Sequence, residues 1–135
     1  NILFNKETRK AISVVDLDTV MPGKFFSDLG DMIRSMTCTV DENSSDWEKI
    51  EIDPACYKNI LSNYEAEMHE QLTEKEKELL PMAGPLIIYM QALRFTSDYL
   101  NNDIYYKIDY PEQNLNRAFN QLILLEKLET LLKES

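Results

Sequence analysis

The sequence predicts a mainly α-helical domain with a small β-hairpin, and two observations support this fold class. Two short apolar runs separated by polar residues open the chain, and helix-start signals then recur through most of its 135 residues. This length is enough for one domain with a substantial core. The longest apolar run, Leu86–Met90, is far too short to span a bilayer.

The predicted hairpin pairs Ile2–Phe4 with Ala11–Val15 across the polar residues 5–10. Because an isolated hairpin is only marginally stable in water, we expect it to lie on other structure. Residues 17–24 are expected to be irregular, with Pro22–Gly23 as the turn signal.

The first helix is predicted over Phe25–Met36, with Ser27 or Asp28 placed to cap it. An acidic, polar segment follows over Val40–Lys49. We expect this segment to be a mobile loop with Trp47 as its one hydrophobic anchor.

The second helix is predicted to begin at Asp53–Pro54 and to run to about Gln71. Asp53 can cap the helix, and proline is favoured at the first helical position. A capping box at Thr73–Glu76 predicts the start of the next helix, which should break near Pro81 and Gly84–Pro85. On the second helix, residues at four-residue steps form the expected apolar face: Cys56, Ile60, Tyr64 and Met68.

An apolar helix is predicted over Leu86–Leu100, ending at Asn101–Asn102. It has no clear polar face, so we expect neighbouring elements to cover it on all sides. An aromatic connector, Asp103–Tyr110, leads to a last helix that Pro111 should open. The expected apolar stripe of that helix comprises Leu115, Phe119, Leu122, Leu125 and Leu132.

The charge and cysteine content narrow the classes of partner. A formal net charge of −10 disfavours nucleic acid and anionic membranes as partners. It does not forbid a phosphate ligand, because a divalent cation can mediate between carboxylates and phosphates. Cys38 and Cys56 form neither a disulfide framework nor a zinc pattern, so we expect two half-buried thiols in a reducing compartment.

The second predicted strand leads directly to Asp16, with Asp18 two residues later. A carboxylate delivered to the edge of a core needs a cation or a hydrogen-bond donor. From the residues alone, Asp16 is equally readable as a metal ligand or as a strand-end carboxylate that caps a turn.

Five segments form a recognisable set of motifs: Asn1-Ile-Leu-Phe, Val15-Asp-Leu-Asp18, Asp28-Leu-Gly-Asp-Met-Ile-Arg34, Ala92-Leu-Arg-Phe-Thr-Ser-Asp-Tyr-Leu100 and Asn114-Leu-Asn-Arg117. Together they resemble the aminoglycoside-phosphotransferase-like kinases, and most closely their N-acetylhexosamine 1-kinase branch. The resemblance implies that residues 1–135 form the C-terminal, acceptor-binding part of the large lobe of a protein-kinase-like fold. It also implies ATP and Mg²⁺ as cofactors.

By this resemblance Asn1 and Asp16 bind the magnesium ion. An amide oxygen and a carboxylate at the two ends of one hairpin can converge on a single ion. Asp18 and Asp28 are expected to give structural support. Asp28 would brace the catalytic loop, or would be a helix N-terminal carboxylate favoured by the dipole.

Arg94 is a guanidinium in the most apolar helix of the chain, where an unpaired charge is costly. Asp98, four residues later, is one candidate partner. By resemblance, Arg94 instead grips sugar hydroxyls or an N-acetyl oxygen, and Tyr105 supplies a hydrogen bond and a flat wall. Tyr105 and Tyr106 cannot both face inward on an extended segment, and the resemblance favours Tyr105.

The implied activity is ATP-dependent phosphorylation of the anomeric hydroxyl of N-acetylgalactosamine or N-acetylglucosamine in a cytoplasm. The base aspartate and the small lobe of the family precede Asn1 in the aligned pattern. We therefore expect residues 1–135 to be a fragment that is inactive alone and that self-associates through its uncovered cleft.

Two alternatives stay open at this point. The first is a kinase of the same fold for another small alcohol, such as an aminoglycoside, choline or homoserine. The second is a non-catalytic, acidic helical interaction module, which would leave Asp16, Asp18 and the hairpin unexplained.

Overall fold

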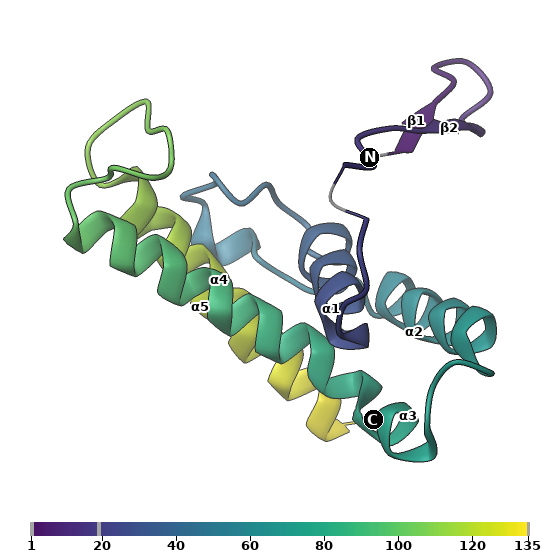
Figure 1. Cartoon of the computed structure of the whole chain (residues 1–135). Helices are drawn as coiled ribbons and strands as arrows, with labels where there is room; N and C mark the ends of the chain where they lie inside the picture. Colours follow the sequence, from purple (N-terminus) through teal and green to yellow (C-terminus); the bar gives the residue numbers. More distant parts are fainter. Residues whose placement is uncertain (1, 19, 135) are drawn as a thin grey trace.

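The computed structural model describes residues 2–18 and 20–134 (Figure 1). It confirms a mainly helical chain with one two-stranded antiparallel sheet. The main elements are β1 (Ile2–Phe4), β2 (Ala11–Val14), α1 (Phe25–Met36), α2 (Pro54–Met68), α3 (Glu74–Leu79), α4 (Ala83–Leu100) and α5 (Gln113–Glu134). Two short 3₁₀ turns, Trp47–Lys49 and Leu80–Met82, lie between them.

The long helices α4 and α5 lie side by side and run in opposite directions, as Figure 1 shows. Helix α1 packs against α4, and α2 lies against α1 on the side away from the α4–α5 pair. Apolar side chains from all four helices join in one core. Its most deeply buried members from α1, α4 and α5 are Leu29, Ile33, Ile88, Leu124 and Leu128.

Two glycines allow α1 and α5 to approach α4 closely. A Cβ atom on Gly30 would overlap Cγ1 of Ile87 and the backbone oxygen of Ala83 in α4. A Cβ atom on Gly84 would lie 2.8 Å from Cγ2 of Ile33 and 2.9 Å from Cδ2 of Leu128. The three helices therefore meet at a junction that has no room for larger side chains.

The buried face of α5 differs from the predicted apolar stripe. Phe119 and Leu122 were expected to be buried, but each is 43% exposed. The face of α5 that is buried includes polar residues, beginning with Asn114. A stripe chosen from apolar residues alone therefore fell on the wrong side of the helix. The buried residues of this face are Asn114, Ala118, Gln121, Leu124 and Leu128.

Helix α4 departs from its prediction in two respects. It begins at Ala83, so Gly84 and Pro85 lie in its first turn, where proline needs no backbone partner. It is also not covered on all sides. One face leaves four large apolar side chains exposed: Leu86, Tyr89, Met90 and Leu93.

The hairpin pairs Ile2 with Val14 and Leu3 with Ser13, and an irregularity follows at Phe4. Every residue of both strands is exposed. Figure 1 shows the hairpin projecting away from the helices. The expectation that it lies on other structure is therefore wrong for the part of the chain that the structure describes.

Two predicted helix caps are confirmed and one is not. Asp53 caps α2, since its Oδ1 accepts the backbone N–H groups of Ala55 (2.9 Å) and Cys56 (3.0 Å). The Thr73–Glu76 capping box opens α3. At α1, however, neither Ser27 nor Asp28 is the capping residue, because the helix begins after Lys24 without a side-chain cap.

The acidic loop is tied to α5 at several points. Nδ2 of the buried Asn120 donates to the backbone oxygens of Asp41 and Ser44, at 3.2 Å each. The ring of Trp47 lies 5.4 Å from that of Phe119, which confirms Trp47 as an anchor.

Cys38 and Cys56 are free and half-buried, as expected. Within residues 2–18 and 20–134, no helix combines the length and the apolar character that crossing a membrane requires.

The glycine junction gives a stability prediction. Alanine favours helix over glycine by about 1 kcal/mol, yet Gly30→Ala should lower the free energy of unfolding by about 2 kcal/mol because the new methyl meets a backbone oxygen. Urea denaturation measures the difference. Gly23→Ala is the control, since its nearest atom would lie 3.8 Å away. Equal stability of the two variants would contradict this packing.

Candidate functional site

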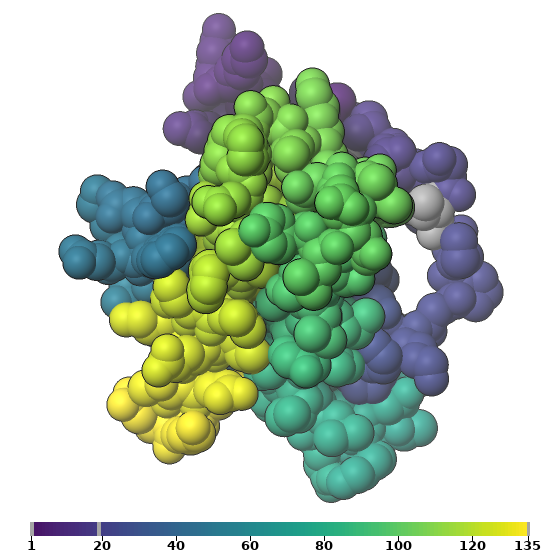
Figure 2. All heavy atoms as spheres, turned by 90° about the vertical axis from the view of Figure 1, so that its left-hand side faces the viewer, coloured from purple at the N-terminus to yellow at the C-terminus, as the bar shows by residue number. Residues whose placement is uncertain are grey.

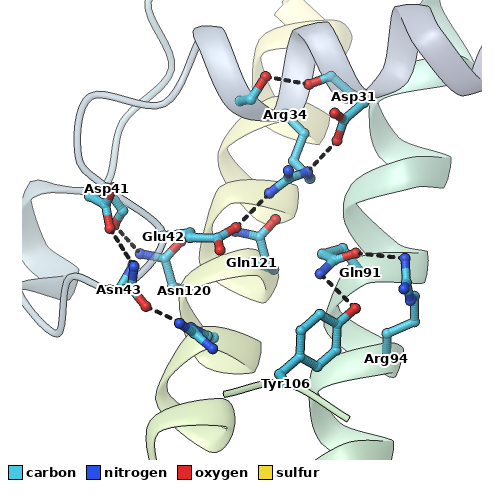
Figure 3. Close-up of polar contacts among 12 residues, drawn as sticks. Asp31, Arg34, Asp41, Glu42, Asn43, Gln91, Arg94, Tyr106, Asn120 and Gln121 are labelled. Atoms are coloured by element: carbon cyan, nitrogen blue, oxygen red, sulfur yellow. Dashed lines mark hydrogen bonds and ion pairs between the residues drawn. The ribbon is translucent and has the colours of Figure 1, made fainter. Parts of the chain in front are cut away.

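Arg94 lies on an exposed part of α4, beside the connector that joins α4 to α5. Its guanidinium carbon is 5.8 Å from the ring centroid of Tyr105 and 5.5 Å from that of Tyr106. Its Nη1 is 3.5 Å from Oε1 of Gln91, whose Nε2 in turn donates to the Tyr106 hydroxyl at 3.3 Å (Figure 3). The two rings and the glutamine thus orient a positive charge at the surface.

Arg94, Tyr105 and Tyr106 line a hollow of about 400 Å³ at the C-terminal end of α4. Arg94 provides hydrogen-bond donors, and the two tyrosines provide flat apolar walls with hydroxyl groups. A ring with several hydroxyl groups, one apolar face and a carbonyl oxygen fits such a lining. The other lining residues are Ser97, Asp98, Asn101 and Ile104.

Asp98 holds the wall of this hollow in place. Its side chain is buried, and its two carboxylate oxygens accept the backbone N–H groups of Tyr105 and Tyr106, both at 2.9 Å. Its Oδ2 also accepts Nδ2 of Asn114 at 3.0 Å. The alternative in which Asp98 pairs with Arg94 is therefore wrong, because the carboxylate faces the connector.

The two tyrosines differ in burial although their rings lie side by side, because the connector bends at both residues and does not run extended. Tyr106 is the inward residue, and its ring lies 4.8 Å from that of the buried Phe95. Tyr105 is 72% exposed, so the expectation that Tyr105 faces inward is wrong. Tyr105 still lines the hollow beside Arg94, with its ring edge-on to Tyr106.

A second layer of polar groups supports Asp98, and the sequence reasoning did not find it. Asn114 is fully buried, and its Nδ2 also donates to Oδ1 of Asp103 at 2.9 Å. Its Oδ1 accepts Nη1 of Arg117 at 3.1 Å. The signal that was available is an amide residue on the face of α5 that the helical period buries.

Asp16 lies in a different part of the molecule. It follows β2 with φ = 60°, a left-handed conformation that a non-glycine residue rarely adopts. It lines a hollow of about 760 Å³ between the segment before α1 and the α1–α2 pair. Other polar residues lining this hollow are Lys24, Ser27, Asp28, Tyr64, Gln71 and Glu76.

The structure tests the predicted metal ligands only in part. Of the two predicted ligands, Asn1 lies outside the described residues and Asp16 is exposed; Asp18, predicted as structural support, is also exposed. Within residues 2–18 and 20–134, no three His, Cys, Asp or Glu side chains come together as a metal cluster.

Asp28 lies in the first turn of α1, where a negative charge is favoured by the helix dipole. The neighbouring Tyr64 donates its hydroxyl to the backbone oxygen of Phe25 at 3.1 Å. Burial, and then the negative charge of Asp28, raise the pKa of Tyr64. Asp28 and Tyr64 thus lie together where α1 begins, beside the hollow that Asp16 lines.

A third polar cluster centres on Arg34, and sequence reasoning assigned it no role. Its Nε donates to Oδ1 of Asp31 at 2.8 Å and its Nη1 to Oε2 of Glu42 at 2.9 Å (Figure 3). Burial opposes the positive charge, but the two carboxylates raise the pKa of Arg34 overall. The pair with Asp31 lies within α1, and the pair with Glu42 joins α1 to the acidic loop.

The predicted site residues therefore fall into two groups. Asp16 and Asp28 share one hollow, and Arg94 and Tyr105 share another. Figure 2 shows an open gap between the segment after β2 and helix α4. No model of a known protein family matches the chain.

The Asp98 contacts give a prediction for the connector. In Asp98→Asn an NH₂ group replaces one of the two oxygens that accept the backbone N–H groups of Tyr105 and Tyr106. We therefore expect the free energy of unfolding to fall by about 2 kcal/mol and amide exchange at both tyrosines to become faster. Urea denaturation and hydrogen exchange measure these effects. Asp109→Asn, at an exposed site on the same connector, should change neither. Unchanged exchange at both tyrosines in Asp98→Asn would contradict the assignment.

Proposed function

We propose that this chain is the acceptor-binding part of the large lobe of an ATP-dependent kinase that phosphorylates the anomeric hydroxyl of N-acetylgalactosamine or N-acetylglucosamine. The observation that carries the proposal is the hollow at the end of α4, where Arg94 and two tyrosines converge. The motif resemblance and the position of Asp16 after the hairpin give additional support.

The lining of the hollow fits an N-acetylhexosamine in three respects. The Arg94 guanidinium can donate to the N-acetyl oxygen or to ring hydroxyls. The exposed face of Tyr105 can stack on the apolar face of the sugar ring. Asp98 keeps that ring beside Arg94 by holding the connector backbone.

Asp16 and Asn1 would hold Mg²⁺ together with the phosphates of ATP. The donor chemistry fits, since a carboxylate and an amide supply the oxygen ligands that Mg²⁺ prefers. When bound, the ion neutralises phosphate charge during transfer. Asp18 and Asp28 would keep the segment between β2 and α1 in position.

The catalytic base is not assigned to any residue of this chain. We therefore expect the 135-residue chain to bind the sugar acceptor without phosphorylating it. With ATP, Mg²⁺ and either N-acetylhexosamine, the chain alone should show no turnover, and measurable turnover would contradict the proposed division of roles.

An interaction module is the second candidate, and one observation favours it. Helix α4 and the hairpin expose large apolar side chains, which is unusual for a surface without a partner. Sugar binding separates the two candidates, because an interaction module has no reason to recognise an N-acetyl group.

Sugar binding is testable by saturation-transfer NMR with N-acetylgalactosamine. We expect a signal at the N-acetyl methyl, with Arg94→Ala weakening the affinity at least fivefold, or about 1 kcal/mol. Lys107→Ala, an exposed cation of the same connector that does not line the hollow, should leave it unchanged. Equal affinity of the two variants, or stronger binding of a cationic aminoglycoside, would refute the assigned acceptor.

A further inference from the structure

The apolar face of α2 remains half-covered in the structure. Cys56, Ile60, Tyr64 and Met68 were expected to face a core, yet all four are only partly buried. The most deeply buried residue of α2 is Tyr57, which is 7% exposed and lies on a different part of the helix. Among the described helices, α1 makes the close contact with α2, and apolar side chains beside this contact remain open.

This strip forms a groove of about 680 Å³ that follows both helices. Helix α1 runs antiparallel to α2 here, since Cys56 Sγ lies 3.4 Å from the backbone oxygen of Met36 and Tyr64 bonds the backbone oxygen of Phe25. Three of the six methionines of the chain line the groove: Met32, Met36 and Met68.

Methionine-rich grooves suit an apolar helix face. The unbranched thioether side chain adapts to different partner side chains, and Met36 is already 59% exposed. The lining of α2 extends from Asp53 to Met68, which corresponds to about 22 Å of helix at 1.5 Å per residue. That length matches four turns of a partner helix, with its apolar anchors at three- and four-residue spacing.

The charged residues of the groove indicate the sign of the charge that a partner should carry. Asp53 and Glu67 lie near its two ends, and no lysine, arginine or histidine lines it. Lys58, the basic residue of α2, lines a separate hollow on another face of the helix. The chain as a whole carries a net charge of −10, which attracts cationic segments over longer distances.

We propose that the α1–α2 groove is a docking site for a basic amphipathic helix of a partner protein. The partner places apolar side chains on the three methionines and Ile60. Its lysine or arginine side chains reach Asp53 and Glu67 at the rim. This groove adjoins the hollow beside Asp16, since Tyr64 and Met68 line both, but the proposed docking does not depend on the kinase function.

Methyl NMR of the whole chain, with ¹³C-labelled methionine, tests the proposal. The probe is a 15-residue helical peptide of leucine and lysine with leucines on one face. We expect it to shift the methyl signals of Met32, Met36 and Met68. Met82, in the 3₁₀ turn before α4, and Met90, on α4, are exposed internal controls for non-specific apolar binding and should not move.

Two comparisons test the chemistry of the groove. A leucine–glutamate peptide of the same pattern should bind at least tenfold more weakly. Glu67→Lys should weaken the leucine–lysine peptide about threefold, whereas Glu126→Lys, which makes the same charge change on α5, should not. Absence of binding, larger shifts at Met82 and Met90, or equal binding of the two peptides would overturn the proposal.

Discussion

The close approach of α1 to α4 at Gly30 is the constraint on which the other features depend. Because no side chain separates the two backbones there, α1 is fixed against the α4–α5 pair. The segment that carries Asp16 leads directly into α1, and α2 packs onto its other side. The position of α1 therefore determines both the hollow beside Asp16 and the groove between α1 and α2.

A buried carboxylate has a comparable role at the other end of α4. Asp98 binds two consecutive backbone N–H groups, and so one face of the connector is held against the helix while Tyr105 projects outward. Asn114 and Arg117 extend this network to α5 and the acidic loop. The polar groups shape the candidate acceptor hollow, while the apolar core only positions the helices.

Local signals in the sequence predicted the fold class and most element starts. The Asp53 cap, the Thr73 capping box and the hairpin are short-range features, and the structure confirms them. Burial was less predictable, because it depends on partners far along the chain. Phe119 is apolar but exposed, whereas Asn114 is polar but buried, since neighbouring elements supply its hydrogen-bond partners. Arg94 and Tyr105 were assigned to one site from the resemblance. The hydrogen-bond partners of Asp98 could not be predicted, because they depend on how the connector folds back onto α4.

The central claim is that the hollow beside Asp16 and the hollow beside Arg94 serve one reaction. Relaxation of the N-acetyl methyl protons of bound N-acetylgalactosamine by Mn²⁺ with ATP measures this directly, because the paramagnetic effect falls steeply with distance. The account predicts strong relaxation in the unmodified chain, its loss in Asp16→Asn, and its retention in Asp109→Asn, a control for other surface carboxylates. Equal relaxation in both variants would contradict the claim.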